Sequence, residues 1–366
     1  MNQTNQLSVK QAVLWFSLYQ IGSMFLVVPR FLTQMARQDG WISPPVAVAM
    51  QLIIIPLFMM LIRQFNGKTF NEYIEMILGK WIGKIVLFIF TIMFPYFMFI
   101  NALRNLTDYI TTSVMTETPA EPLAVMMLIA VICIVRSGVS VIGRFAEIIF
   151  FPLLVIFLVN TAAFVLDAQY ANILPILEYG IGPVFKGSYL LFANPYLESI
   201  LFLFLLGNMT RPEKWGKVVM YSSLISGTTY TSVTLVSIVI LGAGAVANLT
   251  FPTYFIVRTI SLGDFFERFE IIVSMYFYLS IFFRLTLLLY VTAKNLTSIF
   301  ELKDYRSLLI PLSLIAISLQ KDLWSNIVES QDLLKTTPTI HGTLFGLILP
   351  CILCAIGAIR GKKKQL

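Results

Sequence analysis

The stretch that decides the fold is residues 189–206, which read YLLFANPYLESILFLFLL. It is apolar enough to cross a membrane, yet Glu198 stands in it, shortly after the helix-breaking pair Asn194 and Pro195. A carboxylate at the depth of a bilayer costs at least about 2.5 kcal/mol, so a Glu in such a segment indicates a functional residue. Backbone that leaves the helix at that depth is tolerated only where it is buried in protein or lines a cavity. The stretch therefore predicts a membrane protein with a binding site at a broken helix.

The composition of the chain is that of a polytopic membrane protein. Of its 366 residues, 58% are hydrophobic and 12% are charged, whereas soluble domains carry about 25% charged residues. Apolar segments recur along it, and about 20 such residues form a helix that crosses a hydrocarbon core of about 30 Å. We predict a single all-α integral membrane domain over residues 1–366. About ten transmembrane helices are expected, the fourth and ninth of them short, near residues 10–29, 43–62, 82–103, 123–135, 145–166, 187–207, 217–242, 269–293, 306–320 and 340–359.

The basic residues predict the orientation of these segments. With the N-terminus in the cytoplasm, most of the 26 Lys and Arg residues fall on the cytoplasmic side. Because cytoplasmic loops carry such an excess, we expect both termini to lie inside the cell. The net charge of +7 follows this topology and forms no single basic patch, which argues against a nucleic-acid partner.

The sequence lacks the residues that most kinds of catalysis need. His341 is the single histidine, which excludes a multi-histidine metal site and leaves little for a Ser-His-Asp relay. The sequence GKWIGK at 79–84 has the wrong spacing for a phosphate-binding loop. We therefore expect that the protein is not an enzyme and binds neither a metal nor a cofactor.

A second helix break is predicted in the first segment, at residues 20–23, which read QIGS. The first and sixth segments each lead a group of five, at about residues 10–166 and 187–359. Discontinuous helices at matching positions of two halves are typical of secondary transporters built from inverted repeats, which bind their substrate at the breaks. The two breaks predict this fold.

The two breaks differ in the charge that they attract. Amide groups freed after Gly22 and Ser23 would lie at the N-terminus of a half-helix, where a carboxylate is stabilised. Carbonyl groups freed before Pro195, with Glu198 nearby, would attract an ammonium group. Together the breaks suit a zwitterion such as an amino acid. The alternative is that Gly22 and Ser23 form a close helix-packing contact and that Pro195 is only a kink.

Glu198 needs a partner, and Arg284 is the other charged residue deep in an apolar segment. An ion pair between them would satisfy both charges. Two interpretations of this pair are open. It is either a structural pair without a ligand role, or Glu198 is protonatable and coupled to ligand or proton binding.

Further polar and packing residues near the predicted breaks are candidates for a pocket lining. They lie on the third segment around Pro95 and on the face of the eighth segment that carries Arg284. Each is alternatively an interhelical hydrogen bond or an interfacial aromatic residue. The predicted ligand-binding residues are Gln20, Gly22, Ser23, Tyr96, Ile100, Asn101, Asn194, Pro195, Leu197, Glu198, Tyr276, Ser280 and Arg284.

Four stretches give the chain a likeness to a known family. They are IG at 21–22 with LVVPR at 26–30 and QDGWI at 38–42; NILPIL at 172–177 with GIGP at 180–183; Glu198; and ERFE at 267–270. On these residues the chain resembles the B subunit of the nutrient germinant receptors of endospore-forming bacteria. That group is the GerAB-like family of the amino acid–polyamine–organocation superfamily. The pair Asn194 and Pro195 departs from the Gly-containing pattern of the superfamily's amino acid permeases, which leaves the nutrient open.

The resemblance implies a leucine-transporter-type 5+5 fold with broken first and sixth helices, in the inner membrane of the dormant spore. It also implies a complex with an A subunit and a lipoprotein C subunit, which senses an amino acid or similar nutrient and triggers germination. Two other functions are compatible with the residues. One is a permease that moves an amino acid together with a proton through Glu198, and the other is an ion or water conduit.

Overall fold

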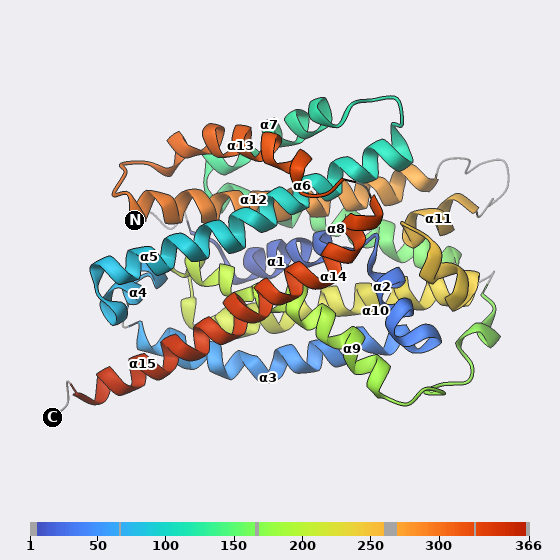
Figure 1. Cartoon of the computed structure of the whole chain (residues 1–366), viewed down its shortest axis with the longest axis horizontal. Helices are drawn as coiled ribbons and strands as arrows, with labels where there is room; N and C mark the ends of the chain where they lie inside the picture. The colour runs from blue at the N-terminus through green and yellow to red at the C-terminus, as the bar shows by residue number, and fades with distance from the viewer. Residues whose placement is uncertain (1–5, 66, 165–167, 260–268, 326, 364–366) are drawn as a thin grey trace.

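The computed structural model describes residues 6–65, 67–164, 168–259, 269–325 and 327–363. In these ranges the chain is almost entirely helical, and most helices run roughly along one axis as a bundle (Figure 1). The first half contains α1 (Val9–Met24), α2 (Val28–Ala36), η2 (Arg37–Ile42), α3 (Ser43–Gln64), α4 (Phe70–Leu78), α5 (Lys80–Thr91), η3 (Ile92–Tyr96), α6 (Phe97–Tyr109), η4 (Ile110–Val114), α7 (Ala120–Ser137) and α8 (Val139–Ala163). The second half contains η5 (Tyr170–Ile173), α9 (Gly182–Leu191), η6 (Phe192–Tyr196), η7 (Leu197–Asn208), η8 (Pro212–Lys214), α10 (Trp215–Asn248), α11 (Pro252–Thr259), α12 (Phe269–Ile299), η9 (Tyr305–Leu308), α13 (Leu309–Leu319), η10 (Gln320–Asp322), α14 (Ile327–Thr343), η11 (Leu344–Ile348) and α15 (Leu349–Lys363).

Helices lie at all ten predicted segments, and the chain is an all-α membrane protein. Eight helical stretches of the described residues are long and apolar enough to cross a membrane: Val28–Gln64, Lys80–Val114, Ala120–Ser137, Val139–Ala162, Gly182–Asn208, Pro212–Leu241, Val273–Ile299 and Lys335–Arg360. The two remaining segments are shorter. The first is α1 with 16 residues, and the ninth is α13 with 11 residues between two 3₁₀ turns.

Some predicted boundaries differ from the structure. The tenth segment begins at Ile327 and not near residue 340, because α14 continues without interruption into the polar residues before the apolar stretch. Three short helices lie wholly or mostly outside the predicted segments: α4, α11 and α2, which overlaps the first predicted segment only at residues 28 and 29. In α4, Thr69 and Glu72 form a reciprocal capping box, which stabilises the start of a short helix. Residues 165 and 166 of the predicted fifth segment, and half of the ERFE motif at 267–270, lie outside the described residues.

Two glycines turn the chain sharply between consecutive helices. Gly79 separates α4 from α5 with φ of +89°, and Gly138 separates α7 from α8 with φ of +95°. Residues with a Cβ rarely adopt these angles, whereas glycine does so at little cost. In both places one helix follows the other with a single glycine between them.

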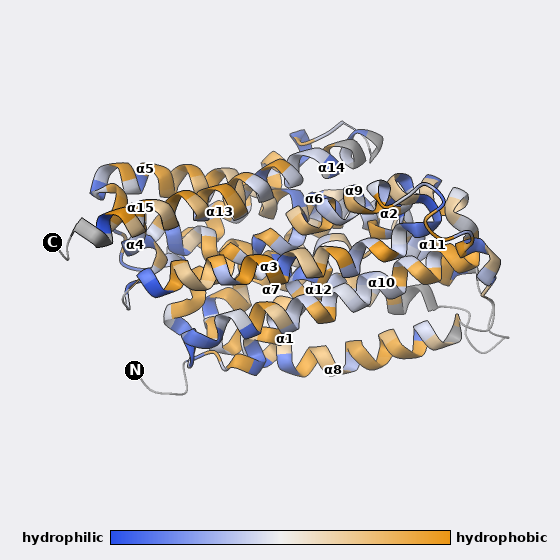
Figure 2. Cartoon of the chain, turned by 90° about the horizontal axis from the view of Figure 1, so that it is seen from below, coloured by the Kyte–Doolittle hydropathy of each residue, from blue (hydrophilic) through white to orange (hydrophobic). Residues whose placement is uncertain are grey.

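The sixth and eighth segments form the centre of the bundle. In the most apolar part of Gly182–Asn208, 89% of the residues are buried, and the corresponding value for Val273–Ile299 is 83%. In α7 the value is only 22%. The outer helices α5, α8 and α15 are largely hydrophobic in Figure 2, as expected for surfaces that face lipid. The broken sixth segment is thus enclosed by other helices on nearly all sides.

Candidate functional site

The first segment is broken, but four to five residues later than predicted. α1 continues through Gly22 and Ser23 to Met24, residues 25–27 form a turn, and α2 begins at Val28. The cause is Pro29, which has no N–H and whose ring prevents a helical bond to the carbonyl of Phe25. That carbonyl instead accepts a hydrogen bond from Thr253 Oγ1 at 3.1 Å. The predicted break at 20–23 was therefore wrong in position, and the amide groups at the half-helix start belong to α2.

The predicted break in the sixth segment is confirmed. Asn194 has φ of −144° and ψ of 107° between α9 and η7, so its backbone is extended and not helical. The carbonyl groups around this break are covered by the last helical segment. A Cβ on Gly342 would overlap the carbonyl oxygen of Ala193, and one on Gly346 would lie 2.5 Å from the carbonyl oxygen of Leu197. The two glycines allow the last segment to pack directly on the broken backbone.

The two breaks meet in the middle of the protein. Ser23 Oγ, at the end of α1, donates a hydrogen bond of 2.8 Å to Asn194 Oδ1. Beside this contact is a cavity of about 30 Å³, which we call the polar cavity. Its volume admits one or two water molecules and is too small for an amino acid. Its lining residues are Gly22, Ser23, Met24, Leu26, Val27, Phe31, Asn101, Ala102, Asn105, Asn194, Phe251, Phe277, Ile281 and Arg284.

The predicted ion pair between Glu198 and Arg284 is confirmed. Arg284 Nη1 lies 2.8 Å from Glu198 Oε2, and Arg284 Nη2 lies 3.0 Å from Oε1, a two-pronged contact. The two side chains are 1% and 5% exposed. Tyr19 on α1 donates a short hydrogen bond to Glu198 Oε2, and the Arg284 guanidinium lies 4.9 Å from the centre of the Tyr19 ring. Both carboxylate oxygens are therefore satisfied inside the bundle, as a buried charge requires.

Gln20 belongs to a polar network that joins α1 to α10. Its Nε2 donates to Ser223 Oγ at 3.3 Å, and its Oε1 accepts from Ser226 Oγ at 2.8 Å. Tyr230 donates a short hydrogen bond to the Gln20 carbonyl oxygen. Sequence reasoning missed these α10 residues and Tyr19. The signal was available, since Ser223, Ser226 and Tyr230 recur at helical spacing in an apolar segment.

Gly22 lines the polar cavity, and it is also a close packing contact, as the alternative interpretation held. A Cβ at this position would lie 2.5 Å from the backbone of Ser280 on α12. The Ser280 hydroxyl donates to the Tyr276 carbonyl oxygen of its own helix at 2.8 Å. A bulky residue at Gly22 would therefore separate α1 from α12, and such a variant cannot report on ligand binding alone.

The thirteen predicted ligand-binding residues do not form one site in the structure. Of the thirteen, five line the polar cavity: Gly22, Ser23, Asn101, Asn194 and Arg284. Tyr96 donates to the Leu312 carbonyl oxygen of α13 at 2.9 Å. Tyr276 lines a second cavity, together with Phe25. Ile100, Pro195 and Leu197 are buried without lining either cavity.

The described part of the chain offers no cluster of metal-binding side chains. Within the described residues, no three His, Cys, Asp or Glu side chains lie close enough together to hold one. The chemistry that the polar cavity offers is therefore hydrogen bonding by three Asn amides and one Ser hydroxyl, beside the paired charge of Arg284.

Comparison with known proteins assigns the family. A family model described as spore germination protein matches residues 6–325. The chain belongs to the spore germination protein family. Its relatives in Bacillus subtilis (strain 168) include spore germination protein KB, 22% identical over 98% of this chain and 96% of that protein. Spore germination protein YndE of the same strain is 25% identical over 82% of this chain and 83% of its own length. Spore germination protein A2 is 24% identical over 93% and 92%.

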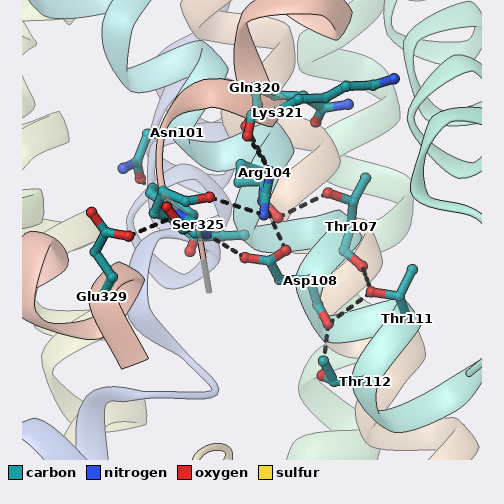
Figure 3. A network of polar contacts seen from close by, with 12 residues as sticks. Asn101, Arg104, Thr107, Asp108, Thr111, Thr112, Gln320, Lys321, Ser325 and Glu329 are labelled. Atoms are coloured by element: carbon teal, nitrogen blue, oxygen red, sulfur yellow. Dashed lines mark hydrogen bonds and ion pairs between the residues drawn. The ribbon is translucent and has the colours of Figure 1, made fainter. Parts of the chain in front are cut away.

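This spore germination protein has a second polar network, at one end of α6 (Figure 3). Arg104 Nε lies 2.8 Å from Asp108 Oδ1, and Trp324 Nε1 donates to Asp108 Oδ2 at 2.7 Å. Arg104 Nη1 also donates to the carbonyl oxygens of Gln320 and Lys321 at 2.9 and 3.1 Å. These carbonyls end the helix α13–η10 and have no helical partner there. The network therefore ties the connection between α13 and α14 to α6, one turn from Asn101 and Asn105.

We expect Arg104→Met in this germination-family protein to release the connection at 320–325. Amide hydrogen exchange should become at least tenfold faster there, because a bond to a charged group is worth about 1.5–3 kcal/mol. Arg306→Met is the matched control, since Arg306 lies 3.9 Å from Asp304 and is half exposed. Unchanged exchange at 320–325 in Arg104→Met would show that the network does not hold this connection.

Proposed function

We propose that this protein is the membrane subunit of a nutrient germinant receptor and binds an amino acid or similar small nutrient between its two broken helices. Its family supports the role in germination. The observation that carries the site is the hydrogen bond between Ser23 and Asn194, which places the two breaks against each other beside a polar cavity.

The lining of the polar cavity suits both ends of a zwitterion. The start of α2 and the Arg284 guanidinium favour a carboxylate, because helix N-termini and Arg donate hydrogen bonds to anions. The amide oxygens of Asn101, Asn105 and Asn194 can accept from an ammonium group. Two of these oxygens already accept a hydrogen bond: Asn101 Oδ1 accepts from Asn105 Nδ2 at 2.9 Å, and Asn194 Oδ1 accepts from Ser23 Oγ at 2.8 Å.

Nutrient binding would require the breaks to separate, since the polar cavity has only about 30 Å³. A nutrient that binds the separated state more tightly shifts the protein toward it. To change the ratio of separated to closed molecules from 1:99 to 99:1, the nutrient must bind the separated state more tightly by about 5.5 kcal/mol. This change of state is the signal that we propose the A and C subunits of the receptor receive.

The proposal includes the arrangement of the chain in its membrane. We infer a leucine-transporter-type 5+5 inverted repeat, with residues of about 10–166 and 187–359 as its halves. The break in α1–α2 and the break at Asn194 support it, since they occupy the first helix of each half. The excess of Lys and Arg on one side supports cytoplasmic termini, and the family supports a location in the inner membrane of the spore.

A proton-coupled amino acid permease is the second candidate, because the buried pair of Glu198 and Arg284 lies beside the same site. A measurement of amino acid uptake distinguishes a receptor from a permease. Labelled amino acids are offered to proteoliposomes that contain this chain, and binding of the same compounds is measured in detergent. Saturable binding without uptake supports a receptor. Concentrative, proton-dependent uptake would make the protein a permease, and conductance without nutrient binding would make it an ion or water conduit.

We expect Asn101→Leu to weaken nutrient binding at least tenfold. The replacement is similar in size, but it removes a polar group of the cavity, and a hydrogen bond to a charged ligand is worth about 1.5–3 kcal/mol. The matched control is Asn71→Leu, since Asn71 is equally buried and bonds Asn295 at 3.3 Å away from the cavity. Equal affinity in the two variants would place the nutrient elsewhere.

A further inference from the structure

A second cavity lies on the other side of the turn between α1 and α2. It has a volume of about 40 Å³ and is lined by residues of α8, α10, α11 and α12 and by Phe25. The Phe25 ring packs at a tilt of 35° against the ring of Tyr276, with 4.6 Å between the ring centres. We call it the apolar cavity, because its lining presents mainly carbon.

The polar side chains that α8, α10 and α11 contribute to its lining donate hydrogen bonds to backbone carbonyl groups. Asn160 Nδ2 donates to the Ile156 carbonyl oxygen at 2.8 Å, and Ser237 Oγ donates to that of Val233 at 2.6 Å. Thr253 donates to the carbonyl oxygen of Phe25. Water in such a cavity would find few partners, and cavities of this kind stay dry and bind hydrocarbon.

The apolar cavity adjoins the side of the bundle that faces lipid. In the most apolar part of α8 only 28% of the residues are buried, and α8 lies along one edge of the bundle in Figure 2. Phe157 on α8 and Val236 on α10 line the cavity and are half-buried. The inner wall is formed by Phe25 and Tyr276, which are only 3% and 5% exposed. The cavity thus extends from the outer helix to the turn that separates α1 from α2.

We propose that the apolar cavity is a binding site for the hydrocarbon chain of a membrane lipid, which enters between α8 and α10 and ends against Phe25. The end of the chain suits the cavity because the lining is carbon and adjoins the bilayer, and a volume of about 40 Å³ admits only the terminal groups of the chain. Burial of each methylene group is favourable in a dry cavity, since it replaces empty space with close contacts. Lipid that merely coats the outer helices does not reach Phe25.

A lipid chain in the apolar cavity would also affect the nutrient site, a consequence that rests on the proposed function. Phe25 lines the apolar cavity, whereas its neighbours Met24, Leu26 and Val27 line the polar cavity. The turn is therefore a wall shared by both cavities. A lipid chain against Phe25 holds this wall in place, and its departure would alter the nutrient site on the other side.

The test is photolabelling with a lipid that carries a diazirine near the end of its acyl chain. The full chain is reconstituted in vesicles that contain this lipid, irradiated, and mapped by peptide mass spectrometry. We expect label on Phe25 and Tyr276, but none on Phe16, which is fully buried in α1 and lines neither cavity. Absence of label from both Phe25 and Tyr276 overturns the proposal, as does equal labelling of Phe16.

A pair of matched variants tests the route of entry. Val236→Trp fills the apolar cavity and should abolish the label on Phe25, whereas Val159→Trp lies on α8 at a position 55% exposed and should retain it. Persistence of the label in Val236→Trp contradicts the proposal.

A second labelling experiment uses a photoreactive aliphatic amino acid in place of the lipid. If it labels Phe25 and the lipid does not, the cavity receives the side chain of a nutrient. Neither lipid arm depends on nutrient binding, so failure of the lipid site and failure of the proposed function are distinguishable.

Discussion

Glu198→Ala and Arg284→Ala should each destabilise the protein by about 3–5 kcal/mol. Removal of one partner leaves the other as an unpaired buried charge, and that is the expected cost. Both side chains are almost completely buried, and their contact is two-pronged. We expect the thermal unfolding midpoint in mild detergent to fall sharply in both variants. Arg306→Ala serves as a control, because Arg306 and its partner Asp304 are half exposed and 3.9 Å apart. Alanine there should cost about 1 kcal/mol or less.

The double variant Glu198→Leu/Arg284→Met separates the two interpretations of this pair. Well-packed apolar residues often replace a buried ion pair without loss of stability, so we expect the unfolding midpoint to recover. We expect nutrient binding not to recover, since Arg284 lines the polar cavity. A double variant that folds and binds nutrient normally would make the pair purely structural. If the double variant is less stable than both single variants, the loss of stability in the single variants does not come from an unpaired buried charge.

Gly342→Ala should lower the stability by about 1–3 kcal/mol, although it adds only one methyl group to a helix. The new Cβ would overlap the Ala193 carbonyl oxygen, and backbone atoms cannot move aside as a flexible side chain can. Away from such a contact, the same change favours the helix by up to about 1 kcal/mol. Gly244→Ala on α10 is the control, since no atom lies within 4 Å of a Cβ there. The unfolding midpoint should fall in the first variant and stay constant or rise in the second. Equal midpoints would show that the last segment does not depend on close contact with the broken helix.

Much of the fold follows from the sequence because membrane segments are long and uniformly apolar. The pair Glu198 and Arg284 was predictable for a related reason, since each is a charge deep in an apolar segment and neither is tolerated there alone. The break at Asn194 was predictable because Pro195 cannot continue the hydrogen bonds of a helix.

The position of the first break was not found because Gly22 served as the signal for it. Glycine in a membrane helix permits close packing as often as it ends the helix, and here it contacts Ser280. Pro29 was the better guide, through its effect four residues earlier at Phe25. The contacts of Thr253 and Gly342 join segments far apart in the chain, and spacing along one segment cannot reveal them.

The hydrogen bond between Ser23 and Asn194 has a consequence for the concentration at which a nutrient acts. If the site opens only when this bond breaks, the apparent dissociation constant is the intrinsic one divided by the open fraction. An open fraction of about 1% would raise it about a hundredfold. A nutrient at low concentration would then bind too little protein to produce a response, and only a higher concentration would produce one. If the protein binds a nutrient as proposed, a single contact between two side chains would thus set the nutrient concentration at which it responds.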